Sequence, residues 1–279
     1  MTSTIKVSKS ALFEMVMAAF EAYAVKHDGK KIVSIETYAE LWGKINKQHP
    51  FMCSIEHVSV DTSAKKERGG VTPNGLSLEI KKDIASVFGE GYQHIGSFHT
   101  HPWLKDEECV PNVLGDMLLV ENANSIRKYN LFNFSNADHA CEVGNPMITI
   151  AKKEYSVALV MTIHATDKSN DVKDGRIESN LFEFSLGNIK LWLKAQVFEH
   201  KLTSTLTDED KKSLDIYRLT KHKSFNLKAF TQPIPIETNL ECAFLEDFGY
   251  YLKGFGRLTI NSANSEYRNT SSAEKRWFA

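Results

Sequence analysis

Cysteine is scarce in this sequence, and the few that are present are scattered. The four cysteines are Cys53, Cys109, Cys141 and Cys242, and no two of them form a C-x-x-C pair. This spacing argues against a zinc finger and against a disulfide framework. Free thiols in a chain of this size are typical of a reducing compartment, so we expect a cytoplasmic protein.

Long hydrophobic runs and an excess of either charge are also missing. The most apolar N-terminal stretch, ALFEMVMAAFEAYAV, contains Glu14 and Glu21, and no run of 18 apolar residues exists. We therefore expect neither a signal peptide nor a membrane-spanning helix. The formal net charge is -1 at pH 7, so the overall charge favours neither nucleic acid nor an anionic membrane as a partner. The sequence leaves the oligomeric state open.

What the chain does have is an ordinary globular composition and a regular alternation of elements. It has 279 residues, of which 42% are hydrophobic, enough to bury a sizeable core. Hydrophobic periodicity predicts an α/β fold with a mixed β-sheet flanked by helices. The expected helices cover residues 8–26, 76–91, 112–129 and 188–202, and the expected strands cover 32–43, 51–61, 94–101, 147–153, 155–165 and 181–186.

The character of the chain changes near residue 201. Thr207 and the acidic residues after it predict a capped helix start, and the two prolines of FTQPIPIET predict an extended segment. We therefore expect a main domain over residues 1–200 and a C-terminal extension of unknown role over 201–279.

Two histidines stand one residue apart at the end of the strand expected over 94–101. Side chains at i and i+2 of a strand face the same way, so His99 and His101 lie side by side while Thr100 faces the opposite side. Pro102 should end the strand and leave the pair open to solvent. The pair could bind one metal ion. Two histidines on a half-buried strand, without metal, remain the alternative.

A catalytic zinc needs a third protein ligand and a base nearby. Asp116, in the first turn of the helix expected over 112–129, is the first choice for the ligand. Its rivals are Asp106, Glu107 and Glu108 in the loop after the histidines. Glu36 lies within an otherwise apolar strand, where a carboxylate is costly unless it has a partner, and could serve as the general base.

These residues together resemble the JAB/MPN family, whose JAMM motif marks zinc-dependent isopeptidases. Glu36 precedes Gly43 by the family's seven residues, IGSFHTHP matches its His-Ser/Thr-His-Pro strand end, and Asp116 stands for its helix-opening aspartate. The likeness covers roughly residues 5–165. It implies a JAB/MPN-like fold with a cytidine-deaminase-like core. It also implies that Glu36 is the general base and that His99, His101 and Asp116 are zinc ligands.

The activity that the resemblance implies is hydrolysis of an amide bond by a water molecule, typically the isopeptide bond of a ubiquitin-like protein or protein conjugate. Trp103 is expected either to line the groove for an extended substrate tail or to pack the loop.

The sequence departs from the family pattern at three places, of which the mildest is Ala39, where the family usually has a glycine three residues after the glutamate. The loop before Asp116 is longer than usual, and Val113 occupies the position of a serine, three residues before the aspartate, whose hydroxyl helps to stabilise the oxyanion. We predict that Asn112 partly replaces that serine. Because the serine is missing, a non-catalytic MPN-like module that binds partners is the alternative function. An amidohydrolase-type barrel also begins with His-x-His, but the remaining chain does not show its eight-fold rhythm.

Overall fold

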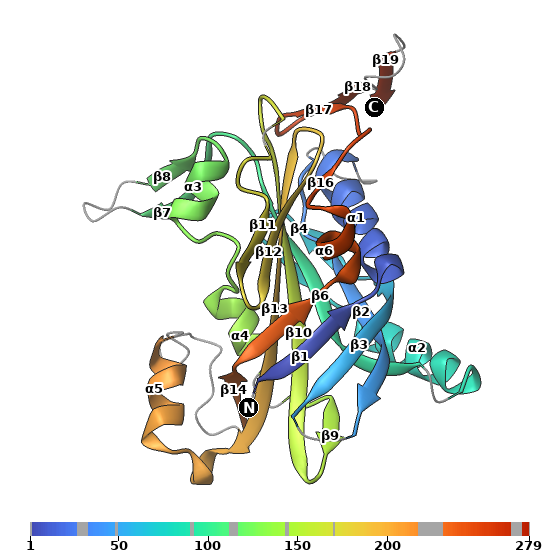
Figure 1. Cartoon of the computed structure of the whole chain (residues 1–279), viewed down its shortest axis with the longest axis vertical. Coiled ribbons are helices and arrows are strands. Elements are labelled where there is room, and N and C mark those ends of the chain that lie inside the picture. Colours follow the sequence, from blue (N-terminus) through green and yellow to red (C-terminus); the bar gives the residue numbers. More distant parts are fainter. Residues whose placement is uncertain are drawn as a thin grey trace.

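The computed structural model describes residues 2–26, 33–47, 50–89, 92–111, 117–142, 145–169, 171–216, 231–268 and 275–278. Its main feature is a large curled sheet of mixed strand direction (Figure 1). The strand order along the sheet is β11-β12-β13-β10-β6-β2-β3-β1-β15, with β9, β14 and β16 paired beside this path. The strands are β1 (Ser3–Val7), β2 (Tyr38–Asn46), β3 (Met52–Val60), β6 (Gln93–Trp103), β9 (Ile148–Ile150), β10 (Lys153–Ala165), β11 (Gly175–Glu178), β12 (Leu181–Leu186), β13 (Ile189–Leu202), β14 (Thr231–Ile236), β15 (Thr238–Glu241) and β16 (Tyr251–Leu252).

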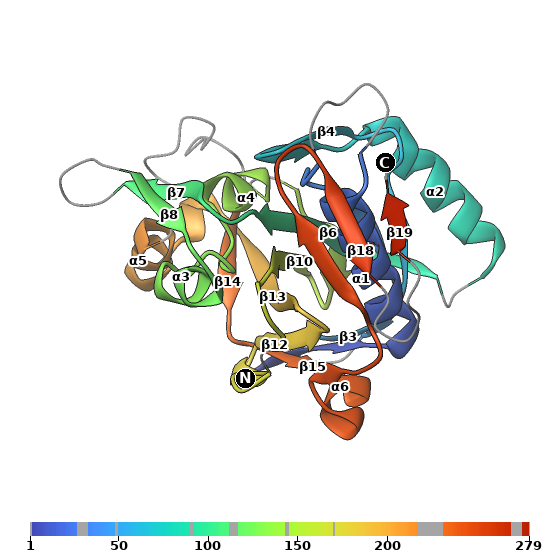
Figure 2. The same cartoon turned by 90° about the horizontal axis from the view of Figure 1, so that it is seen from above.

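Helices and small sheets surround this large one. The helices are α1 (Lys9–Ala24), α2 (Gly75–Val87), α3 (Ala123–Lys128), α4 (Asn136–Cys141), α5 (Asp208–Ile216) and α6 (Ala243–Phe248), with a short 3-10 turn at Thr203–Thr205. The small sheets are the hairpin of β4 (Lys65–Glu67) and β5 (Gly70–Thr72), the hairpin of β7 (Glu107–Pro111) and β8 (Met117–Val120), and the sheet of β17 (Arg257–Ile260), β18 (Ser265–Arg268) and β19 (Lys275–Phe278). Figure 2 shows α3, α4 and the β7–β8 hairpin on the side of the molecule away from α2. The predicted α/β class is confirmed.

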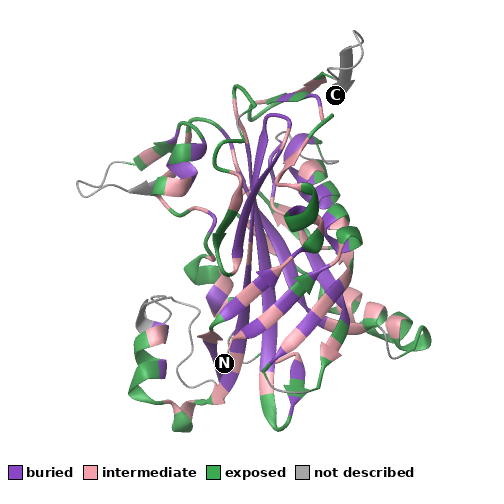
Figure 3. Cartoon of the chain, viewed as in Figure 1, coloured by how far each residue is buried: buried purple, intermediate pink, exposed green. Residues whose placement is uncertain are grey.

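The core lies between the central strands and α1. Ser8 begins α1 by accepting a hydrogen bond from the Ala11 N–H at 3.1 Å, as an N-cap residue does. The helix then buries one face, which includes Leu12, Met15 and Tyr23, against β3, β6 and β10. Figure 3 shows that the central strands are buried along most of their length. The two faces of β10 are both covered, as its continuous apolar run predicted.

The glycines that bracket the site region are required by close strand contacts. A Cβ on Gly43 would lie 1.9 Å from the Ser54 carbonyl oxygen, and one on Gly96 would lie 1.9 Å from the Val157 carbonyl oxygen. No side chain fits at that separation. Gly43 also sits where the register between β2 and β3 shifts.

One predicted helix is wrong, because residues 188–202 form the strand β13. It pairs with β10 over twelve residues and also with β12 and β14. A period of two is present in the sequence, with Ile189, Leu191, Leu193, Ala195 and Val197 all on the face that joins the main core. The buried Trp192 and Phe198 on the other face obscured that alternation and produced an apparent helical spacing.

Three other boundaries differ from the prediction. The helix expected over 112–129 is wrong at Met117–Val120, which is strand β8, and its helical part begins only at Ala123. The strand expected over 32–43 begins at Tyr38, so Glu36 lies just before it. The expected loop 62–75 contains the β4–β5 hairpin.

Strand β6 also continues through Pro102 to Trp103. Proline is tolerated because β2 pairs with β6 only as far as His99, which leaves Pro102 with β10 as its single partner.

Three strands of the expected C-terminal extension are hydrogen bonded into the large sheet. The expected boundary at residue 200 falls inside β13, while β14, β15 and β16 pair with β13, β1 and β12 respectively. The predicted helix start at Thr207 is confirmed, since its Oγ1 accepts the Asp210 N–H at 3.1 Å. Among the described residues, no helix is long and apolar enough to cross a membrane.

Candidate metal centre

The two histidines of β6 point into the same space, as the strand pleat requires. Their Nε2 atoms lie 3.1 Å apart, and their rings meet edge to face with centroids 4.9 Å apart. Thr100, between them, faces the other way and bonds Thr37: the Thr37 N–H donates to Thr100 Oγ1 at 3.0 Å, and the Thr100 N–H donates to the Thr37 carbonyl at 3.2 Å. This contact fixes the segment next to Glu36 against the histidine strand.

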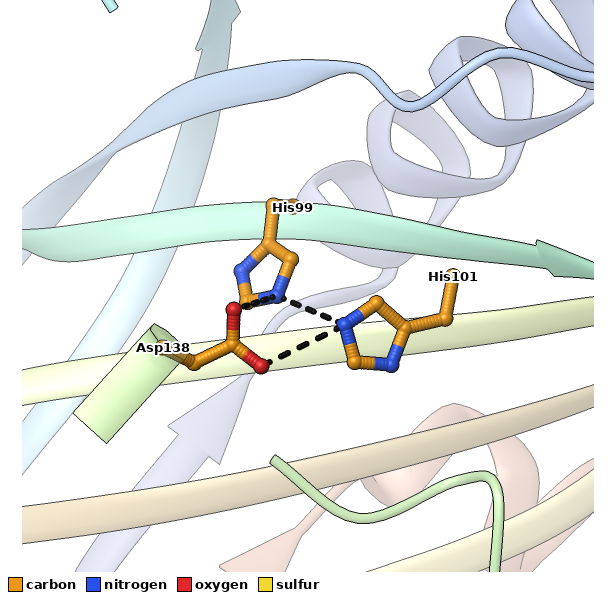
Figure 4. A group of neighbouring side chains, drawn as sticks. All are labelled: His99, His101 and Asp138. Atoms are coloured by element: carbon orange, nitrogen blue, oxygen red, sulfur yellow. Dashed lines mark hydrogen bonds and ion pairs between the residues drawn. The ribbon is translucent and has the colours of Figure 1, made fainter. Parts of the chain in front are cut away.

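The carboxylate that the structure brings to this pair is Asp138. Its Oδ1 lies 3.2 Å from His99 Nε2, and its Oδ2 lies 3.4 Å from His101 Nε2. Figure 4 shows the two imidazoles and the carboxylate converging on one point. One ligand atom from each residue lies within 4.8 Å of the others, so the three could hold a metal ion. Burial opposes ionisation of Asp138, but the two histidines outweigh it and hold the pKa of this carboxyl well below its usual range.

Asp138 is held by the start of α4. Ser135 caps the helix by accepting the Asp138 N–H at 3.2 Å, while Asp138 Oδ2 accepts the Ser135 N–H at 2.6 Å. This reciprocal capping box fixes both ends of the first turn. Behind it, His139 is buried and meets Phe198 of β13 edge to face, with centroids 5.4 Å apart. The carboxylate is therefore presented from a fixed helix end rather than from a free loop.

Glu36 lies on the same cavity as the metal-binding group. The cavity has a volume of 840 Å³ and is lined by Glu36, His99, His101 and Asp138, among others. The Glu36 N–H donates to the Glu67 carbonyl at 2.8 Å, and the preceding Ser34 and Ile35 N–H groups bond the last turn of α1. Burial raises the pKa of Glu36 to about 7, with His101 lowering it and Asp138 raising it further.

Trp103 lies between the cavity and a second apolar cluster. It lines the cavity, and its side chain packs against this cluster, which includes Val120, Ile126 and Trp192. Its carbonyl accepts hydrogen bonds from the Tyr23 hydroxyl and from His164 Nδ1, both at 3.0 Å. The end of β6 is thus anchored on both sides.

Three of the predicted site positions, Asn112, Val113 and Asp116, lie outside the described residues. Of the rivals to Asp116, Glu107 and Glu108 line the same cavity, but Glu107 bonds Arg68 at 2.9 Å and the Leu104 N–H at 2.8 Å. Asp106 and Glu108 are exposed. None of these three acids belongs to the metal-binding group found among the described residues.

Asp138 was not predicted from the sequence, because the third ligand was expected in the segment that directly follows the histidines. The signal was present in the sequence, since Ser135-Asn136-Ala137-Asp138 places a serine three residues before an aspartate at a helix start. That is the separation which the JAMM resemblance expects. The β7–β8 hairpin and α3 lie between His101 and this segment. The connection is therefore much longer than the loop from His101 to Asp116.

No model of a known protein family matches this chain, and a search of curated proteins finds no match either. The resemblance to the JAB/MPN family therefore depends on the residues and their geometry alone.

Proposed function

We propose that this protein is a zinc-dependent hydrolase of amide bonds, of the isopeptidase type that the JAMM resemblance implies. The observation that carries the proposal is the convergence of two histidines and Asp138 beside the half-buried Glu36 in one cavity. A site with two histidines, one carboxylate and an open position is the donor set of a catalytic zinc.

The distances between the ligand atoms are compatible with a tetrahedral metal ion such as zinc. Zinc ligands at 2.0–2.1 Å in a tetrahedron lie about 3.3 Å from one another. The nitrogen and oxygen atoms of this site lie 3.1, 3.2 and 3.4 Å apart. Zinc could therefore bind with little movement of His99, His101 or Asp138.

The chemistry divides between the metal and the chain. A bound zinc would polarise the substrate carbonyl and lower the pKa of water, which allows water to act as a nucleophile near neutral pH. Glu36 accepts the proton of the attacking water and donates it to the nitrogen of the leaving amine. In the metal-free protein burial raises the pKa of Glu36 to about 7, and a carboxyl whose pKa is raised by burial is a better acceptor of this proton than an exposed one. Ser135 lines the cavity, and its hydroxyl proton is available to an oxyanion because its oxygen is the atom that accepts the Asp138 N–H.

The test is hydrolysis by zinc-loaded protein of a ubiquitin-like protein joined through its C-terminal carboxyl to a lysine side chain, followed by gel and mass spectrometry. We expect cleavage by the wild type and a loss of about 10²–10⁴-fold in kcat for Glu36→Gln, with unchanged zinc content. Glu108→Gln is the matched control, because Glu108 is an exposed carboxylate on the same cavity.

Equal turnover by Glu36→Gln and wild type would remove Glu36 from the mechanism. Stoichiometric zinc without any hydrolysis would instead favour the partner-binding module. Zinc retained after His99→Ala and His101→Ala together would show that the proposed centre is not the metal site.

A further inference from the structure

Glu142 is a second carboxyl on the wall of the metal-site cavity, and the proposed mechanism does not use it. It follows Asp138 by four residues at the C-terminal end of α4, so both side chains leave the same face of the helix. Glu142 is only 5% exposed and lines the cavity. Because burying a carboxyl costs free energy, its position on the cavity wall needs a physical explanation.

A buried hydrogen-bond chain fixes its orientation. Ser156 Oγ donates to Glu142 Oε2, and Ser156 Oγ also lies 2.9 Å from His200 Nε2. A hydroxyl has one proton, so if it donates to Glu142, His200 must donate to it through Nε2. Ser156 is fully buried and His200 nearly so. The chain His200–Ser156–Glu142 thus stabilises the carboxylate form and holds one oxygen.

Within the described parts of the chain, no lysine, arginine or histidine forms an ion pair with Glu142. Two other buried acids do have such a partner: Glu40 lies 2.8 Å from His94 Nε2, and Asp210 lies 2.7 Å from Lys201 Nζ. Asp61, which is also buried, instead accepts hydrogen bonds from Ser63 and Asn74. Arg68, which also lines the cavity, is paired with Glu107. Burying a carboxylate without an ion-pair partner is costly. Burial raises the pKa of Glu142 to about 7; the Ser156 hydrogen bond and the charge of His99 partly offset this, and Asp138 adds to it.

A zinc ion would not supply the missing charge. Its two positive charges are matched by the carboxylates of Asp138 and Glu36, which leaves the negative charge of Glu142 over. The surroundings of Glu142 suit the stem of a long side chain: Phe198 stands opposite Ser156 in the β10–β13 register, and Ala158 follows on the same face of β10. Both line the cavity, together with Met147.

We propose that Glu142 forms a subsite that binds a lysine or arginine side chain of the polypeptide substrate, next to the scissile amide. The apolar wall contacts the methylene stem, and the carboxylate held by Ser156 pairs with the cationic end. This subsite rests on the proposed function for its meaning, but its binding can be measured without turnover.

The experiment uses the zinc-loaded wild-type protein, in which Glu36 keeps its charge, and four probes: the N-acetyl amides of lysine, arginine, norleucine and citrulline. Citrulline matches arginine in shape but carries no charge. We expect the cationic probes to bind about tenfold more tightly than their neutral counterparts in NMR titrations, because one charge-assisted hydrogen bond contributes at least this much. Adding Glu142→Gln should remove the preference, whereas adding Glu108→Gln should leave it.

Equal affinity for arginine and citrulline amides in the protein with Glu142 intact would overturn the subsite, and this comparison needs no folded Glu142 variant. A preference that survives Glu142→Gln in a folded protein would overturn it too. Cation preference at Glu142 in a protein that never hydrolyses amides would support the subsite while removing the proposed function. Hydrolysis of amides without a preference for the cationic probes would support the proposed function and overturn the subsite.

Discussion

Two groups of charged side chains in this protein differ in whether their positive and negative charges cancel. The first is a network of Arg127, Glu183, Lys190 and Asp174, in which two positive side chains meet two negative ones. The second is the set of carboxyls around the cavity, Glu36, Asp138 and Glu142, which no arginine or lysine among the described residues neutralises. The first group is internally neutral, and the second is balanced only when cations enter.

The neutral network ties an arm of the chain to the sheet. Arg127 of α3 forms two hydrogen bonds with Glu183 of β12, and Trp192 donates to the same carboxylate at 2.9 Å. Lys190 pairs with Asp174 and lies 3.3 Å from Glu183. The segment that follows α3 supplies part of the cavity wall, including Leu131 and Phe134. The first group of charges thus holds the cavity wall in place, whereas the second group faces the cavity.

The largest expected effect distinguishes the two groups by stability. Glu183→Gln leaves Arg127 and Lys190 with too little negative charge, and breaking such a buried set costs about 3–5 kcal/mol in the free energy of unfolding. Glu142→Gln keeps its hydrogen bond to Ser156 and removes an unmatched charge, so we expect a loss of about 1 kcal/mol or less. Urea denaturation of both variants measures the difference. Similar losses in the two variants would contradict the comparison.

Metal binding should complete the second group and stabilise the fold. At free zinc one hundred times its Kd, a site that binds only the folded state adds about 2.7 kcal/mol to the free energy of unfolding. The wild type should therefore melt at a lower temperature after chelation, and zinc should restore it. In His101→Ala the melting temperature should not respond to zinc. A zinc response that persists in this variant but disappears in a variant elsewhere would place the metal at another site.

The smallest effect separates the helix cap from the metal site. Ser135→Ala and Ser8→Ala each remove an N-cap hydrogen bond, which costs about 1 kcal/mol. Only Ser135→Ala should also weaken zinc binding, because the cap of α4 orients Asp138. Ser135→Asn should recover stability, since asparagine caps helices well. Calorimetric zinc titrations test the idea, and equal zinc affinity in both alanine variants would reject it.

The sequence by itself determined the elements whose patterns are local. The apolar spacing of α1 and the continuous apolar run of β10 follow from neighbouring residues, and the structure agrees with both predictions. The side-by-side placement of His99 and His101 follows from the period of a strand and needs no other part of the chain. The acidic first turn and Thr207 likewise predicted the start of α5.

Only the tertiary structure decided what meets the histidines. Asp138 comes from a helix that follows the β7–β8 hairpin and α3, and no local pattern states how far a chain travels before it returns. Glu142 is notable only because Ser156 of β10 donates to it and His200 of β13 lies beside Ser156 in turn. The same reason explains the error at β13: apolar residues on both sides of a segment fit a buried helix or a buried strand equally well. Many of the hydrogen bonds that choose between them come from β10 and β14, which are distant in sequence.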